Sequence, residues 1–298
     1  MNLDEVALRL FAAWLTERGV PGTPSWEPSD DHYRLLIGDS SLAVAISPLF
    51  EQDSGDWLKQ KAMLEEQLAA ALENGSYVLW LPPGAILPLE EPDRTDFIFR
   101  VKMRAAALQT GDSVDLNIPV PIAIHKQDAE GSYASTIGGL SPIWSWFTER
   151  IRGVYNIDAR ALTRLPESRD EREKLVETIS AELATMEVGQ RKQLTVDDSW
   201  TLQRITGAAG FAVIGAPPEQ LPAERETRKR VRAILASAQS SLEAEPIKAL
   251  LMPALYLYRS EENVSTAVRG FDPALYAGLD YVLLIADGGV KPIIAPPA

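Results

Sequence analysis

Side chains that commonly carry catalysis are scarce in this sequence. Among its 298 residues there are two histidines, His32 and His125, and no cysteine. The composition excludes disulfides, thiolate nucleophiles and iron–sulfur clusters, and two imidazoles are too few for a zinc site with several histidines. A Ser-His-Asp triad would have to use one of these two residues. His125 follows an alternating apolar stretch and precedes Lys126 and Asp128, so it is either a general base or a histidine in a surface loop.

Carboxylates near the N-terminus are the next candidates for chemistry, and hydrophobic periodicity predicts the elements around them. Asp30 and Asp31 stand just before the first strand of a predicted hairpin. The elements expected in this part of the chain are, in order, a helix over 2–18, a short strand near 25–26, a hairpin of 32–37 and 42–46, a helix over 56–73 and a strand at 77–81.

This order resembles the core of the restriction-endonuclease-like nucleases, the PD-(D/E)XK superfamily, over residues 1–81. In that family an Asp begins the second strand, and a Glu-x-Lys or Asp-x-Lys tripeptide on the third strand completes a Mg²⁺ site. Asp30 and Asp31 match the first position, but Ala45, Ile46 and Ser47 occupy the place of the tripeptide. The resemblance therefore implies a degenerate core from which the catalytic motif is missing.

Two interpretations remain open for the predicted helix over 56–73. It carries Lys59, Lys61, Glu65 and Glu66. In a nuclease with relocated active-site residues, these side chains would join the aspartate pair around Mg²⁺, the only cofactor that the sequence suggests. The other interpretation is that they form the solvated face of an amphipathic helix.

A basic stripe is expected on a helix over 222–242. Arg225, Arg228, Lys229 and Arg232 share one face of that helix, because residues three and four apart are neighbours on a helix surface. Such a stripe can bind phosphates or an acidic partner. It can also be a solvated face or contact the other half of the chain, since residues 1–150 carry a net charge of −11 and residues 151–298 only −2.

The alternation of strands and helices predicts a mixed α/β (α+β) fold with a three-layer core of sheet and helices. We expect an acidic unit over 1–150 and a second α/β unit over 151–298. Val114 to Ile124 alternate strictly, and Pro119 and Pro121 on the opposite face predict an edge strand or a bulged strand. The remaining expected elements are helices at 95–108, 141–151 and 169–187 and strands at 154–157, 192–196, 211–214, 250–258, 281–286 and 292–294.

These observations favour a non-catalytic interaction or scaffold protein built on a degenerate nuclease-like core. The alternative is a Mg²⁺-dependent nuclease that uses Asp30, Asp31, Lys61, Glu65 and Glu66. We expect a protein partner or a homo-oligomer, and contact with nucleic acid only through residues 225–232. The sequence has no stretch of 18 apolar residues and no signal peptide, so we expect a cytoplasmic protein that does not enter a membrane.

Overall fold

The computed structural model describes residues 1–38, 40–51, 55–72, 74–166, 168–217, 224–242, 246–255 and 257–296, with the backbone alone at 40, 224–225, 257–260 and 262. The helices are α1 (Leu3–Glu17), α2 (Gly55–Ala71), α3 (Asp93–Ala105), α4 (Trp144–Thr148), α5 (Arg169–Ala184), α6 (Glu224–Ser241) and α7 (Leu257–Arg269). The strands are β1 (Ser25–Pro28), β2 (Tyr33–Ile37), β3 (Ser40–Ile46), β4 (Ser76–Trp80), β5 (Ser113–Asp128), β6 (Ser132–Gly138), β7 (Gly153–Ala159), β8 (Arg191–Ile205), β9 (Gly210–Ile214), β10 (Lys248–Pro253), β11 (Tyr281–Ala286) and β12 (Gly289–Ile294). None of the described helices is long and apolar enough to cross a membrane.

The chain divides into two compact units. Unit 1 contains Met1–Val114 and Thr201–Ala298, and unit 2 contains Asp115–Trp200. The long strands β5 and β8 each contribute residues to both units. The boundary near residue 150 that the sequence suggested falls inside unit 2, because the chain leaves unit 1 once and returns to it.

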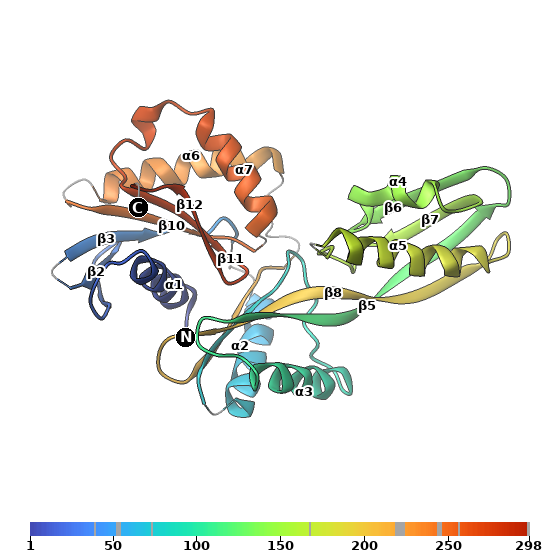
Figure 1. Ribbon diagram of the computed structural model, residues 1–298, viewed down its shortest axis with the longest axis horizontal. Helices are drawn as coiled ribbons and strands as arrows, with labels where there is room; N and C mark the ends of the chain where they lie inside the picture. The colour runs from blue at the N-terminus through green and yellow to red at the C-terminus, as the bar shows by residue number, and fades with distance from the viewer. Residues whose placement is uncertain are drawn as a thin grey trace. The chain divides into compact units, whose positions relative to one another are not determined.

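Unit 1 has the expected three layers. Its first sheet has the order β1-β2-β3-β10-β11-β12, in which β1, β2 and β3 are antiparallel and β10 runs parallel to both β3 and β11. One face of this sheet packs on α1, and the other packs on α6 and α7 (Figure 1). Residues Ala249–Pro253 of β10 are buried on both faces, which is why that strand is an unbroken apolar run.

The first 81 residues contain the predicted elements, but those elements do not form one sheet. Strand β4 pairs antiparallel with β8 and parallel with β9, in the second six-stranded sheet. In the sheet that holds β1–β3, the parallel neighbour of β3 is β10, and the helix that packs on this part of the sheet is α6. Residues 47–247 thus separate β3 from β10, its neighbour in the sheet, a feature that the linear order of elements does not reveal.

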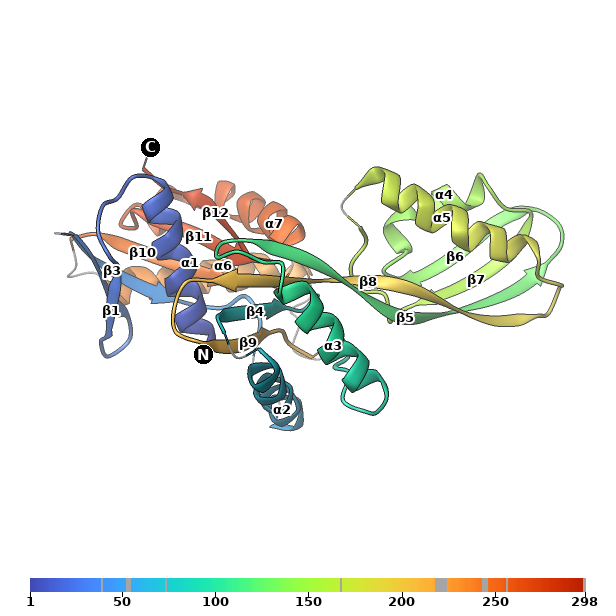
Figure 2. The same cartoon turned by 60° about the horizontal axis from the view of Figure 1, so that its bottom comes forward.

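Unit 2 is a four-stranded part of the second sheet with helices on one face only. Its strands have the order β6-β7-β5-β8, and β6 and β7 are parallel. Helices α4 and α5 cover one face of this sheet (Figure 2), and their apolar side chains pack against those of β5 and β7. Strand β5 lies between β7 and β8 only from Ala123 onward, so the stretch that carries Pro119 and Pro121 is an edge, one of the two predicted alternatives, and a register shift lies further along, between Lys126 and Asp128. Pro119 and Pro121 precede Ala123, where the pairing with β7 begins, and therefore leave that ladder intact.

Candidate binding face on the sheet of unit 2

The uncovered face of the unit 2 sheet presents polar side chains from all four strands. Strand alternation determines which side chains reach it. On β5, Lys126 points to the helices, because its Nζ donates to the Met186 carbonyl (2.7 Å) and lies over the Tyr155 ring. On β8, Lys192 likewise pairs with Glu182 of α5. Their neighbours His125 and Arg191 therefore point to the open face.

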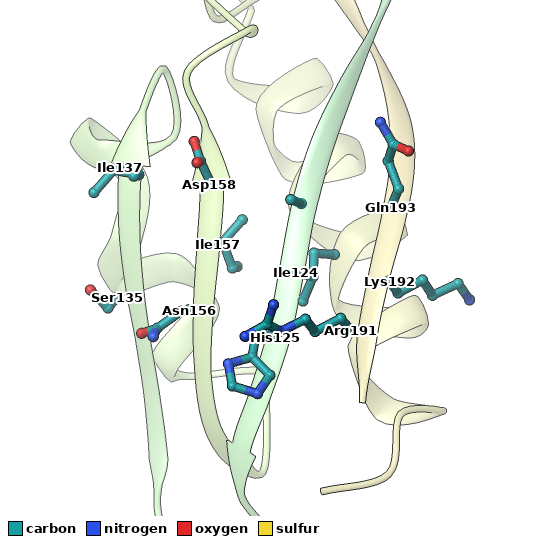
Figure 3. Close-up of a pocket in the computed structure, with 11 residues that line it drawn as sticks. Ile124, His125, Ser135, Ile137, Asn156, Ile157, Asp158, Arg191, Lys192 and Gln193 are labelled. Carbon is teal, nitrogen blue, oxygen red and sulfur yellow. The ribbon is translucent and has the colours of Figure 1, made fainter. Parts of the chain in front are cut away.

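Four of these side chains form one row across the strands. In the sheet register Ser135 of β6 is opposite Asn156 of β7, and Asn156 is opposite His125 of β5. The hydrogen bond from Lys126 N to Gln190 O (3.1 Å) then brings Arg191 of β8 next to His125. Figure 3 shows Arg191 reaching across β5 toward His125. With strands about 4.8 Å apart, the row is roughly 14 Å long.

A second row beside the first supplies the floor of a hollow. Ile137, Asp158 and Ala123 are opposite one another on β6, β7 and β5. Ala123, which has only a methyl side chain, and Gln193 of β8 also line this hollow. The two rows border a shallow hollow of about 780 Å³, within the size range of small-molecule sites.

The charges in the hollow are unequal. Asp158 is already bound by the Arg160 guanidinium, with Nη2 to Oδ2 at 2.6 Å, and this hydrogen bonding holds the pKa of Asp158 below its ordinary value. The side chains of Arg191, His125 and Asn156 make no hydrogen bond or ion pair with any described residue. One positive charge and several free donors therefore face solvent in a chain whose net charge is −13.

The opposite side of the sheet holds these strands in place through a buried carboxylate. Asp198 of β8 accepts hydrogen bonds from Thr163 N and Oγ1 (3.1 and 2.8 Å), from Arg164 N (2.9 Å) and from Trp200 Nε1 (3.2 Å). Burial raises the pKa of Asp198, and the four donors oppose that rise because they favour the ionised form. Asp198 thereby fixes the loop between β7 and α5 against β8.

The aspartates predicted for a metal site lie elsewhere. Asp30 and Asp31 are exposed in the turn between β1 and β2, and Asp31 Oδ1 is 3.2 Å from His32 Nδ1. Strand β1 is the edge strand of the first sheet in unit 1. Across the described ranges, no group of three or more histidine, aspartate or glutamate side chains is placed to hold a metal ion.

The helix residues proposed to join them have structural partners on the other sheet. Glu65 of α2 accepts a hydrogen bond from Val213 N of β9 (2.7 Å) and pairs with Lys61 Nζ (3.1 Å). Lys59 pairs with Asp56 at 3.3 Å, and Glu66 is exposed. The structure therefore does not bring these residues together with the aspartates of the β1–β2 turn.

The basic stripe on α6 is partly used by the fold. Arg228 donates to the Gly270 carbonyl (2.9 Å) and lies over the Phe271 ring, and the intervening Arg230 pairs with Glu51 (3.2 Å). Lys229 and Arg232 are exposed and make no hydrogen bond or ion pair with a described residue. The side chain of Arg225 lies outside the described part of the chain.

Of the row on the open face, sequence reasoning identified only His125. Ser135 was missed because β6 (Ser132–Gly138) mixes small, polar and apolar residues without a clear alternation. Asn156 and Arg191 lie in or beside strands that were predicted, but their positions next to His125 depend on the order of the strands in the sheet. The signal that was available is strand alternation, which assigns His125 to the face opposite the apolar side chains of β5.

Comparisons of the chain with protein-family models, with curated proteins and with solved structures find no match.

Proposed function

We propose that this protein is a non-catalytic binding protein in which unit 2 recognises the anionic group of a ligand or partner. The phosphate or carboxylate oxygens of that group lie in the hollow on the open sheet face. Arg191 supplies the charge, and His125, Asn156 and Ser135 supply further hydrogen-bonding groups along the same row. Asp158 does not repel the anion strongly, because Arg160 already neutralises it.

The observation that carries this proposal is the unpaired Arg191 beside three free polar side chains. Hydrogen bonds from a guanidinium to a carboxylate or phosphate are about twice as strong as bonds between neutral groups. In a chain with a net charge of −13, a local excess of positive charge distinguishes this face from the surrounding surface. The floor of Ala123 and Ile137 gives the uncharged part of a ligand an apolar surface.

A binding role also fits the sheet of unit 1. The elements on which the nuclease-like resemblance was based are divided between two sheets, because β1–β3 lie in the first sheet and β4 pairs with β8 and β9 in the second. At the end of β3, Ala45, Ile46 and Ser47 occupy the place where that family has its acidic residue and lysine. Glu65 and Lys61 of the alternative site are engaged on the other sheet. We therefore propose binding rather than phosphodiester cleavage.

Thermal unfolding in increasing inorganic phosphate, with ionic strength held constant by chloride, tests the proposal. A ligand present at ten times its Kd stabilises the folded protein by about 1.4 kcal/mol, which for a chain of this size raises Tm by about 2 °C. We expect this rise in the wild type and in Lys192→Gln, whose changed side chain points to α5. We expect Arg191→Gln to require at least about tenfold more phosphate for the same rise, since a charge-assisted hydrogen bond contributes about 1.5–3 kcal/mol.

The comparison between the two variants removes the general stabilisation that phosphate exerts by exclusion from protein surfaces, because that effect acts on both alike. An equal rise in Arg191→Gln and the wild type would contradict the proposal, since phosphate would then act elsewhere on the molecule.

A further inference from the structure

Strand β6 is an unprotected sheet edge. It stands first in the strand order and pairs only with β7, in one continuous register from Ser132 to Gly138. Its seven residues include no charged residue and no proline, and no bulge interrupts the pairing. Charges, prolines and bulges are the features with which proteins keep edge strands from pairing with other chains. Because β6 lacks all three, its free side is suited to receive another strand.

Apolar side chains gather along this edge. Tyr133 and Ile137 of β6 are 50% and 48% exposed, and Trp144 at the start of α4 is 46% exposed. The Tyr133 and Trp144 ring centroids are 6.3 Å apart. Half-exposed aromatic side chains next to unpaired backbone groups are typical of a surface that is covered by a partner.

The sequence of β6 is complementary to itself. When two copies of β6 run antiparallel about a two-fold axis at Ser135, Tyr133 of one copy is opposite Ile137 of the other, and Ala134 is opposite Thr136. Aromatic side chains pair favourably with β-branched ones across antiparallel strands, and no charge meets a like charge. The Ser141 hydroxyl donates to the Thr136 carbonyl (3.1 Å), whose second lone pair remains for the ladder.

We propose that the occupant of this edge is a second copy of the chain, and that the two β6 strands join two unit 2 sheets into one. Ser135 of each copy then meets at the two-fold axis, so the rows from Arg191 to Ser135 become one continuous polar row across the dimer. The pairing itself does not depend on the proposed anion site. A seven-residue strand and three half-exposed side chains per copy form an interface at the small end of the known range, for which we expect micromolar affinity.

Opposite charges at the two-fold axis test this arrangement. We expect the wild type to pass from 32.7 kDa to twice that mass in sedimentation equilibrium between about 1 μM and about 1 mM. Ser135→Lys and Ser135→Asp should each stay monomeric, because two like charges then lie directly opposite each other. An equimolar mixture of the two variants should regain the doubled mass at wild-type concentrations or below.

Thr195→Lys is the matched control, because it adds the same charge to the exposed side of β8, away from the β6 edge, and should dimerise like the wild type. Circular dichroism and Tm of each variant report whether the fold is kept. A wild type that stays monomeric throughout would overturn the proposal. So would a Ser135→Lys variant that dimerises like the wild type, or a folded variant mixture that does not associate.

Discussion

Replacement of Asp198 by Ala is expected to destabilise unit 2 by about 3–5 kcal/mol, one of the largest effects of a single substitution in this chain. The reason is that four hydrogen bonds to one buried carboxylate are lost together. The backbone donors of Thr163 and Arg164 and the Trp200 indole lose the carboxylate that accepts their hydrogen bonds, and Arg164 and Trp200 are buried. The free energy lost when a buried donor has no acceptor is larger than the net contribution of a hydrogen bond to stability, because the bond replaces one that the donor made with water.

The neighbouring Asp197 provides the control for this experiment. It is exposed on β8 and makes no hydrogen bond or ion pair with a described residue, so Asp197→Ala should change stability by at most about 0.5 kcal/mol. The stability of both variants is measured by urea unfolding, with hydrogen exchange of the unit 2 amides as the probe of that unit. Equal unfolding midpoints for the two variants would contradict the structural role assigned to Asp198.

The second large effect is expected for Gly138→Ala, at about 3 kcal/mol or more. Gly138 has φ +81°, and a Cβ atom there would lie 2.3 Å from the Ala159 carbonyl oxygen and 2.4 Å from its carbon. The clash is with backbone, so the turn must move away from the β7–α5 loop. That movement would break the hydrogen bonds that Gly139 N donates to Ala159 O and Leu162 O (3.1 and 3.0 Å).

Gly189 allows the backbone strain to be measured alone. Its φ of +82° is nearly the same as that of Gly138, but a Cβ at this position meets no atom within 4 Å. Gly189→Ala should therefore cost only the left-handed conformation, about 1–2 kcal/mol. Denaturant unfolding of the two variants should differ by at least about 1 kcal/mol, and equal losses of stability would show that Gly138 is not closely packed.

Periodic helices were predictable from the sequence with little error. Apolar residues at helical spacing placed α1 (Leu3–Glu17), α5 (Arg169–Ala184) and α6 (Glu224–Ser241) within two or three residues of their observed ends. Helices α5 and α6 each bury one stripe of side chains against a sheet, as the spacing implies, whereas α1 packs against strands of both sheets. The glycine predicted to end α1 lies just beyond it, with Gly19 at φ +85°.

Other elements were not predictable, for reasons of packing. Residues 250–258 were expected to form one strand, but β10 ends at Pro253 and α7 begins at Leu257. A short apolar run shows no periodicity that distinguishes a buried strand from a helix, so the end of the strand could not be placed from the sequence. Strand β8 was expected over 192–196 only, and its continuation to Ile205 is stabilised by pairing with β4, from far away in the sequence.

The candidate site illustrates the same limit. The alternation of β5 is visible in the sequence and assigns His125 to the polar face. Its neighbours in the row come from positions 31 and 66 residues later in the chain, Asn156 and Arg191, and the sheet order alone makes them neighbours. Sheet order in turn depends on the return of the chain through β7 and β8, which local patterns do not encode.

The proton NMR signals of the imidazoles test directly whether an anion binds beside Arg191. The chain has only two histidines, and the His125→Gln variant identifies the signal of His125. The signals of His125 and His32 are followed at fixed pH and ionic strength while inorganic phosphate is added. We expect a saturating shift of the His125 signal, an unchanged His32 signal, and no such shift of His125 in Arg191→Gln. A His125 signal that stays in place throughout, or that shifts to the same extent without Arg191, would contradict an anion site on the open face of unit 2.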